Sequence, residues 1–129
     1  MSGRIAEQTV EAYLRGLASD APTPGGGAVA ALSGATGAAL ISMVCNLTIG
    51  KQGYEEAEER MRWMLEVAEA ARTEFLELAD RDATAFDGVM AAFKMPKETP
   101  EQTAARSAAI QAGYAAAAAV PHDVARTAV

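Results

Sequence analysis

The sequence predicts an all-helical protein: an antiparallel bundle of several helices, with a central glycine- and alanine-rich helix and one long amphipathic helix. Alanine, the residue with the highest helix propensity, supplies about a quarter of the 129 residues. Valine, isoleucine and aromatic residues, which favour strands, are sparse, and aromatic residues make up only 5% of the chain. Apolar residues recur at helical spacing in successive segments that glycine or proline separates. Sheet-based folds are therefore disfavoured.

Length and charge limit the functional classes. A chain of 129 residues corresponds to one domain. Its net charge of −6, without a basic patch, suits a phosphate backbone poorly, so no nucleic-acid partner is expected. The single cysteine and single histidine give no zinc-site spacing, so no metal is expected. The first residues lack the apolar core of a signal peptide, and a cytoplasmic location is expected.

Residues 21–50 contain no charged side chain, and the segment is long enough to cross a bilayer. Two interpretations compete, a membrane span and a buried core helix. Alanine and glycine gain little on transfer to lipid, and polar residues interrupt the segment: Ser33, Thr36, Ser42, Asn46 and Thr48. The composition therefore favours a core helix and no membrane partner.

The first two helices are predicted on either side of a turn. One covers residues 4–18, with Ile5, Val10, Tyr13, Leu14 and Leu17 on one side, and it ends before the proline-containing residues 19–24. The next begins within Gly25, Gly26 and Gly27 and extends to about Thr48. Small residues on several of its faces allow close approach of neighbours, which predicts a central helix surrounded by others.

The third and fourth helices follow the break at residues 50–53. An apolar stripe over residues 54–93 predicts a helix too long for a compact domain, and a dimer that shares this helix would explain its length. Thr99, Pro100 and Gln102 then form a capping box that starts another helix. Pro121 is predicted to kink or end that helix, and residues 122–129 to begin a fifth.

Asp82 is the most informative polar residue, because helical spacing places it within the apolar stripe, among Phe75, Ala79, Phe86 and Val89. Burial raises the pKa of a carboxyl group and prepares it to exchange protons near neutral pH. A structural aspartate that pairs with another helix is an equally good interpretation of the pattern.

Gly25, Gly26 and Gly27 lead directly into a helix N-terminus, where backbone amides favour anions and glycine lets a ligand approach. No Gly-Lys-Ser/Thr follows, so the segment is not a nucleotide-binding P-loop. As a bare pattern, a tight turn with close packing is favoured over a binding loop.

Other candidate side chains lie in residues 45–63 and near the end of the chain. Lys51 follows the C-terminus of the central helix, where it can stabilise the helix dipole, hold a ligand carboxylate or lower the pKa of a neighbouring acid. Cys45 is expected to be a buried apolar residue, and His122 to lie at the surface without a role. Trp63, Met61 and Met64 are expected to be core or dimer contacts rather than a cofactor site.

Three motifs together resemble the cyclodeaminase-domain family, which contains formiminotransferase-cyclodeaminases and bacterial methenyltetrahydrofolate cyclohydrolases. They are Ala-Pro-Thr-Pro-Gly-Gly-Gly-Ala at residues 21–28, Met-Val-Cys-Asn-Leu-Thr-Ile-Gly-Lys at 43–51, and Asp-Ala-Thr-Ala-Phe at 82–86 followed by Met-Pro-Lys at 95–97. The details of residues 42–51 are most similar to the stand-alone cyclohydrolases. The resemblance runs from the first helix to the last residue, without a formiminotransferase portion.

This resemblance implies an all-helical fold, a homodimer or larger homo-oligomer, and a folate site among helices near the subunit contact. Members of the family continue with further helices, so residues 1–129 are expected to form a single domain that is incomplete at its C-terminus. The implied reaction is the hydrolytic opening of 5,10-methenyltetrahydrofolate to 10-formyltetrahydrofolate. The alternatives are ammonia release from 5-formiminotetrahydrofolate and a non-catalytic helical dimerisation module.

Neither reaction needs a metal or redox cofactor, because groups that move protons to and from the reacting atoms are sufficient in kind for the bonds that form and break. The catalytic roles are assigned to Asp82, Asn46 and Lys51: a poised carboxylate, an orienting amide and a cation. Substrate binding is assigned to Pro24, Gly25, Gly26, Gly27 and Thr48. The sequence leaves open which end of folate meets the glycines.

Overall fold

The computed structural model describes residues 3–129 and contains only helices and connections over that range. Two short 3₁₀ helices, η1 (Ile5–Glu7) and η2 (Glu55–Ala57), precede longer elements. The α-helices are α1 (Val10–Leu17), α2 (Gly26–Thr48), α3 (Glu58–Phe93) and α4 (Pro100–Thr127). The predicted all-helical class is confirmed, and α2 and α3 end at the predicted residues.

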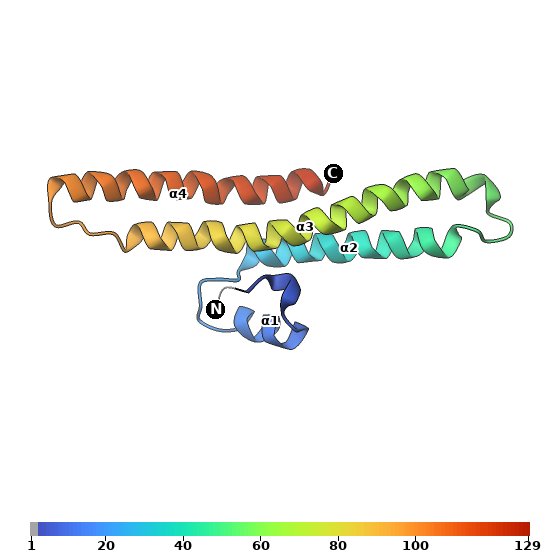
Figure 1. Ribbon diagram of the computed structural model, residues 1–129, viewed down its shortest axis with the longest axis horizontal. Helices are drawn as coiled ribbons and strands as arrows, with labels where there is room; N and C mark the ends of the chain where they lie inside the picture. The colour runs from blue at the N-terminus through green and yellow to red at the C-terminus, as the bar shows by residue number, and fades with distance from the viewer. Residues whose placement is uncertain (1–2) are drawn as a thin grey trace.

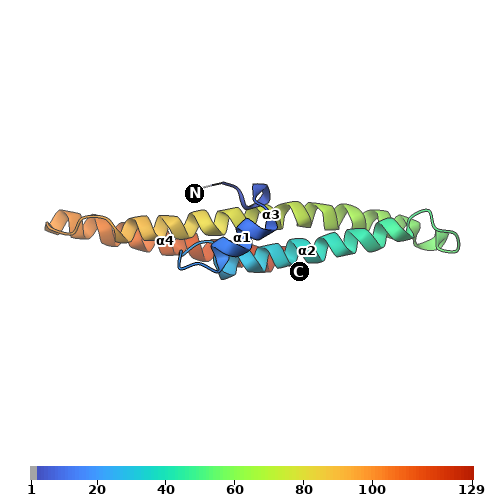
Figure 2. The ribbon, with the colours of Figure 1, turned by 90° about the horizontal axis from the view of Figure 1, so that it is seen from below.

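The long helices form an extended rod in which α2, α3 and α4 run alternately up and down (Figure 1). α3 spans almost the whole rod and has 36 residues, or about 54 Å at the α-helical rise. α2 packs along one half of α3, and α4 packs along the other half, so the three overlap only near the middle (Figures 1 and 2). The short α1 lies beside this overlap.

The main core lies at the overlap, because only there does each helix have two neighbours. It is built from the buried residues Ile5, Ala28, Ala31, Phe75, Leu78, Ala79 and Val120. The α2 members are alanines, so the α2 and α3 backbones can approach closely. Gly34 shows how close: a β-carbon at this position would lie 2.7 Å from the Phe75 ring. The small residues therefore serve the contact of α2 with α3.

Two predicted helix boundaries are wrong. The first helix does not run over residues 4–18: Gln8 and Thr9 are extended, and the Thr9 side chain accepts the Ala12 N–H at 3.0 Å to start α1. The predicted fifth helix does not exist, because α4 continues through Pro121 to Thr127. Five alanines in the preceding residues 115–119 give the helix high propensity, and the buried Val120 holds it against the core.

The prediction that α2 is surrounded by other helices is also wrong for the described residues. One face of α2 packs on α3, and large apolar side chains on its other faces are exposed: Val29, Leu40, Ile41, Met43, Val44 and Leu47. By length and hydropathy α2 could cross a membrane, and 28% of its most apolar window is buried. We call this exposed, uncharged surface the bare face of α2.

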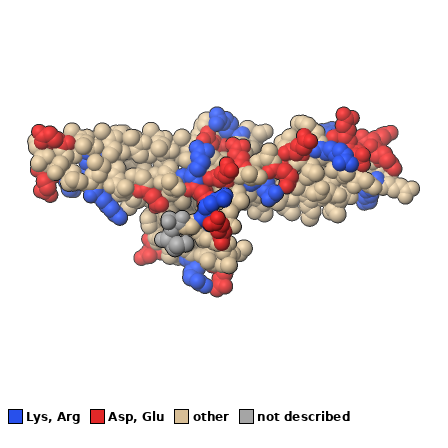
Figure 3. Space-filling model, viewed as in Figure 1, with Lys and Arg blue, Asp and Glu red and all other residues tan. Residues whose placement is uncertain are grey.

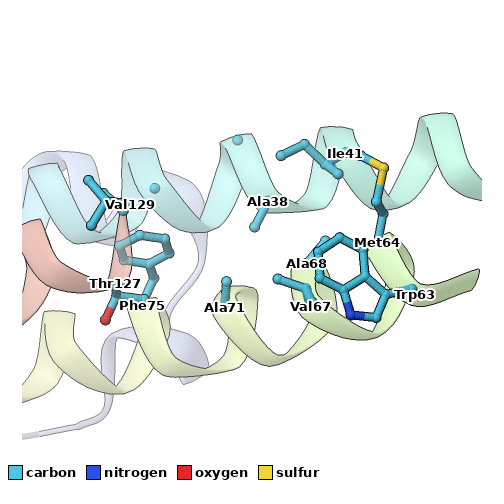
Figure 4. Close-up of a pocket in the computed structure, with 13 residues that line it drawn as sticks. Ala38, Ile41, Trp63, Met64, Val67, Ala68, Ala71, Phe75, Thr127 and Val129 are labelled. Carbon is cyan, nitrogen blue, oxygen red and sulfur yellow. The ribbon is translucent and has the colours of Figure 1, made fainter. Parts of the chain in front are cut away.

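An apolar groove of about 440 Å³ runs between α2 and α3 where α4 stops. Figure 4 shows Ala38 and Ile41 from α2 facing Met64, Val67 and Ala71 from α3, with Thr127 and Val129 at one end. Trp63 lies at the other end with 63% of its surface exposed, so it is not a core residue of the single chain, and the alternative of a dimer contact stays a prediction. Cys45, by contrast, is buried as predicted.

Candidate active site

A pocket of about 340 Å³ opens where the loop before α2 meets α3 and α4. The loop contributes Pro22, Thr23, Gly25, Gly26 and Gly27, α3 contributes Asp82 and Phe86, and α4 contributes Ala117 and Pro121. Two of the three sequence motifs therefore meet here, although about 55 residues separate them in the chain. We call this space the Asp82 pocket.

Asp82 lies against the first turn of α2. A β-carbon on Gly27 would overlap the Asp82 carboxylate, so the carboxylate occupies the space that a side chain at position 27 would need. Partial burial raises the pKa of Asp82 above its ordinary value, and the nearby Ala28 backbone N–H lowers it by a smaller amount. The sequence prediction of a desolvated carboxyl group on the apolar stripe is confirmed.

The three glycines differ in what they do. At Gly26 a β-carbon would meet nothing within 4 Å, and at Gly25 it would be in ordinary contact, 3.6 Å from the Pro22 carbonyl oxygen. Among the three, only Gly27 has no room for a side chain. The Asp82 carboxylate already lies at the α2 N-terminus, so the main role of the loop is to leave space for this side chain.

The loop is tied to α3 by a contact that the sequence did not reveal. The Thr23 hydroxyl donates a hydrogen bond of 3.2 Å to Asp87, five residues beyond Asp82 on α3. The walls from Ala117 and Pro121 were also missed, because Pro121 was predicted to kink or end α4. The helical spacing of Ala117 and Pro121, four residues apart, was the available signal for a shared face.

Pro24 lies on the other side of the loop. It lines a separate, smaller pocket of about 190 Å³ with Gln8 and Asp80, and it is not part of the Asp82 pocket. Asp80 is engaged in fixing the N-terminal segment, because its Oδ1 accepts the Ile5 backbone N–H at 2.7 Å.

The other predicted site residues lie at the far end of α2. Asn46 is 19 residues from Gly27, which corresponds to about 28 Å along the helix axis. The Thr48 hydroxyl donates to the Val44 carbonyl at 2.8 Å, and Lys51 is exposed with Nζ 5.0 Å from the centre of the Tyr54 ring. One chain therefore does not bring Asn46, Thr48 or Lys51 to Asp82.

Asp82 is the one ionisable residue among those that line its pocket. Two nearby arginines are engaged elsewhere: Arg81 with Asp123 at 3.2 Å, and Arg4 with Asp80 at 3.6 Å. Within residues 3–129, no three His, Cys, Asp or Glu side chains are grouped so that they could hold a metal ion. The arrangement is suited to proton transfer by a carboxyl group against a partly apolar wall.

Comparison with known proteins identifies the family of the chain. A sequence profile described as formiminotransferase-cyclodeaminase matches residues 9–129. The chain belongs to the formiminotransferase-cyclodeaminase family. Its match to this family covers all the elements from α1 to α4, including every residue that lines the Asp82 pocket.

Relatives within the family include two different enzymes. The methenyltetrahydrofolate cyclohydrolase of Methylorubrum extorquens is 53% identical over 114 residues, which cover 88% of this chain. The formimidoyltransferase-cyclodeaminase of Rattus norvegicus is 37% identical over 123 residues, or 95% of this chain, and matches over 23% of its own length. The crystal structure of formiminotetrahydrofolate cyclodeaminase from Thermotoga maritima superposes with a TM-score of 0.79 at 36% identity, over 95% of this chain.

The chain spans about half the length of its stand-alone relatives: 55% of the Methylorubrum cyclohydrolase and 57% of the Thermotoga cyclodeaminase.

Proposed function

We propose that this chain acts as a methenyltetrahydrofolate cyclohydrolase, which opens 5,10-methenyltetrahydrofolate to 10-formyltetrahydrofolate. The observation that carries the proposal is the Asp82 carboxyl group, which has a raised pKa and lies at the wall of a ligand-sized pocket. The identity of 53% to a cyclohydrolase, against 37% to the rat formimidoyltransferase-cyclodeaminase, favours this reaction over ammonia release. A cytoplasmic location is part of the same proposal.

In the proposed reaction, Asp82 moves a proton in both steps. A water oxygen forms a bond to the methenyl carbon while Asp82 accepts one proton from that water. The bond between this carbon and N5 then breaks, Asp82 returns its proton to N5, and the hydroxyl proton leaves to solvent. The product carries the formyl group on N10, and the net reaction consumes one water and releases one proton. A carboxyl group whose pKa is raised above its ordinary value is suited to both transfers.

We further propose that the protein is a homodimer in which the bare faces of α2 pack together in antiparallel orientation. Gly37 lies at the midpoint of Gly26–Thr48, and a β-carbon there would meet nothing within 4 Å. Two α2 helices can therefore approach closely at Gly37. No charged residue interrupts α2, so the contact would bury only apolar and small polar side chains.

This dimer would bring one end of α2 in one copy level with the other end of α2 in its partner. In an antiparallel pair centred on Gly37, Asn46 of one copy lies at the same height along the helix axis as Ala28 of the other, because each is nine residues from the centre. We propose that Asp82 acts with Asn46 and Lys51 of the second copy, whereas within one chain these residues are separated by most of α2.

An enzymatic assay tests the proposed function. The loss of the methenyl absorbance is followed with the 129-residue chain and with Asp82→Asn, beside a parallel assay for ammonia release from 5-formiminotetrahydrofolate. Hydrolysis that depends on Asp82 supports the proposal, and ammonia release alone would replace it by the cyclodeaminase activity. If neither reaction occurs and calorimetry detects no folate binding, the chain is a non-catalytic helical dimerisation module.

Disulfide trapping tests the orientation of the dimer. Cys45 is first replaced by alanine, and Gly37→Cys or Val44→Cys is then introduced in that background. An antiparallel pair centred on Gly37 brings together the two thiols introduced at position 37 and keeps apart the two introduced at position 44, which lies on the same helix face. Only the first variant should therefore crosslink efficiently. A parallel pair would crosslink both variants, and a monomer would crosslink neither.

A further inference from the structure

The loop before α2, residues 19–25, is joined to α3 by one hydrogen bond among the described residues. The Thr23 hydroxyl donates to the Asp87 Oδ1 at 3.2 Å. The other hydrogen bonds of the loop stay within the loop or join it to the adjoining helices α1 and α2, through Ser19, Ala21 and Gly25. Thr23 and Asp87 are therefore the polar attachment of this loop to α3.

The packing of α3 does not explain why position 87 is acidic. Asp87 is exposed and lies outside the buried core. None of the ion pairs formed within residues 3–129 includes it. Its specific contact is the bond from Thr23, so its role is to be found in the loop.

Thr23 lies between two pockets. It lines the Asp82 pocket, and on its other side it lines the smaller pocket that contains Asp80 and Asp87. The loop is thus the partition between the two spaces. If Thr23 moved away from α3, the Asp82 pocket would open toward solvent on this side.

The segment that surrounds Asp82 is held to α3 at two points. At one, Gly27 lies against the Asp82 carboxylate, and at the other, Thr23 donates to Asp87. The two points are four residues apart in the loop and five residues apart on α3, or about 7.5 Å along the helix axis. A short segment fixed at both ends has few conformations, so its conformational entropy is lost on folding and not on binding.

We propose that Thr23 and Asp87 are positioning residues for the hydrolysis. Their hydrogen bond holds the loop before α2 against α3, and this keeps water away from one side of the Asp82 carboxylate. Neither side chain exchanges a proton with the substrate. This inference rests on the proposed function and adds two residues that act through Asp82.

The pH dependence of the rate separates this role from a purely structural one. Burial raises the pKa of Asp82, so a loop that detaches and admits water should lower that pKa toward its ordinary value. Asp82 must be deprotonated to accept a proton from water, so the acidic limb of kcat/KM should then move to lower pH. The charged groups on the elements around Asp82 are unchanged in Thr23→Val: Asp80, Arg81, Asp87, Asp123 and, in the proposed dimer, Lys51 of the second copy.

Variants of Thr23 and Asp87 separate the hydrogen bond from the charge. Thr23→Val keeps the shape and charge but removes the donor. It should lower kcat about three- to tenfold, as expected for one exposed hydrogen bond, and should move the acidic limb to lower pH by about 0.5. Asp87→Ala should reduce kcat equally, and the double variant should lose no more than either single one. Thr23→Ser and Asp87→Asn, which keep a hydroxyl donor and an oxygen acceptor, should recover most of the rate.

Thr84→Val is the matched control. Thr84 is on α3 and lines the smaller pocket but not the Asp82 pocket, so this variant removes a hydroxyl group without affecting the Thr23–Asp87 bond. It should leave kcat and the acidic limb unchanged. If Thr23→Val also hydrolyses at the wild-type rate with the wild-type pH profile, the inference is overturned and the proposed function stands.

Amide hydrogen exchange of the substrate-free chain tests the attachment without an activity assay. Thr23→Val and Asp87→Ala should raise the exchange rates of the Gly25, Gly26 and Gly27 amides several-fold, whereas Thr84→Val should not. Unchanged exchange in the first two variants would overturn the inference even if the chain does not hydrolyse the folate. Faster exchange in a wild-type background that lacks hydrolysis would instead retain the attachment and overturn the proposed function.

Discussion

At the scale of single residues, Asp82 and Gly27 form one unit. The carboxylate lies where a side chain at position 27 would be, and this contact desolvates it and raises its pKa. A group with these properties is unfavourable for folding at neutral pH, because its charged form has lost hydration. We expect its role in proton transfer to account for its presence.

Asp82→Asn should abolish activity without lowering stability at pH 7. Because the folded-state pKa of Asp82 is raised, the folded protein binds more protons than the unfolded chain between the two pKa values. The free energy of unfolding therefore falls as pH rises through this window. Asparagine does not titrate, so this decrease in the free energy of unfolding is absent from the variant. Cyclohydrolase rates should fall by about 10²–10⁴, and thermal melts from acidic to neutral pH should show a weaker pH dependence. A rate within about threefold of the wild type would contradict the catalytic role.

Gly27→Ala should be much more harmful than Gly26→Ala. The new methyl group at position 27 overlaps the Asp82 carboxylate and must displace it, whereas position 26 is open. We expect Gly27→Ala to lower the melting temperature and to reduce folate affinity, and Gly26→Ala to leave the melting temperature within a few degrees of the wild type.

Gly26→Val tests whether a ligand approaches the backbone at position 26, since a bulkier side chain there should weaken folate binding more than it lowers stability. A large drop in stability at unchanged affinity would indicate that Gly26 serves the turn alone.

At the scale of elements, the contact of α2 with α3 depends on small residues opposite large ones. Gly34 faces the Phe75 ring, and Ser42, which is buried, donates to Glu69 at 2.8 Å. Glu69 also accepts from Arg72, and these bonds lower its pKa to about 2. The two helices are thus joined by a close apolar contact and, two turns further on, by a polar one.

Gly34→Ala and Gly88→Ala should have opposite effects on stability. The alanine methyl at position 34 collides with Phe75, so repacking should cost about 1–3 kcal/mol. Gly88 lies in α3 with open space around its β-carbon position, so alanine should stabilise by about 0.5–1 kcal/mol through helix propensity. Chemical denaturation of both variants measures the difference. Equal stabilities would show that α2 and α3 can separate at Phe75 without cost.

Most elements could be predicted because their signals are local. The Thr99 capping box acts within one turn, and the structure contains it as predicted. The break at Gln8 and the passage of α4 through Pro121 could not be predicted as readily. At both places a local preference competes with a tertiary contact. The Asp80 carboxylate accepts the Ile5 backbone N–H, and Val120 packs in the core. Periodicity also placed Phe86 and Phe93 on the stripe, but both are partly exposed because the stripe extends beyond the region where the helices overlap.

The candidate site likewise has a part that local sequence patterns predict and a part that depends on tertiary contacts. Helical spacing was sufficient to single out Asp82, because its angular position among apolar residues does not depend on the rest of the fold. The separation of Asn46 from Gly27 could also have been derived, since 19 residues of uninterrupted helix fix a distance of about 28 Å. The walls from Ala117 and Pro121 depend on how α4 folds back along α3, which no local pattern records.

At the scale of the whole molecule, the distribution of charge indicates where a partner can pack. Acidic and basic side chains gather over the first half of α3, at the right of Figure 3, while much of the surface over α4 at the left is uncharged. α2 has no charged residue at all over its 23 residues. The bare face of α2 is therefore the surface we expect the second copy to cover.

Val44→Glu should dissociate the dimer without unfolding the chain. The Val44 side chain is 55% exposed in one chain, so a glutamate there can remain in solvent, but burial between two copies would bring two like charges into an apolar contact. Sedimentation should show a dimer for the wild type at micromolar concentration and a monomer for the variant. Gln111→Glu on the exposed side of α4 adds the same charge as a control and should remain dimeric. A wild-type chain that sediments as a monomer would contradict the proposed assembly.

The confinement of three-helix packing to the middle of the rod implies a gradient of backbone opening along it. Local unfolding requires the least free energy where buried contacts are few. Amide hydrogens near residues 49–57 and 94–99, at the two tips, should therefore exchange with deuterium fastest, and those around Ala79 slowest. The Asp82 pocket lies beside the slowest region, so the carboxyl group is held on the part of the backbone that opens least often, while the tips can open and close without moving it.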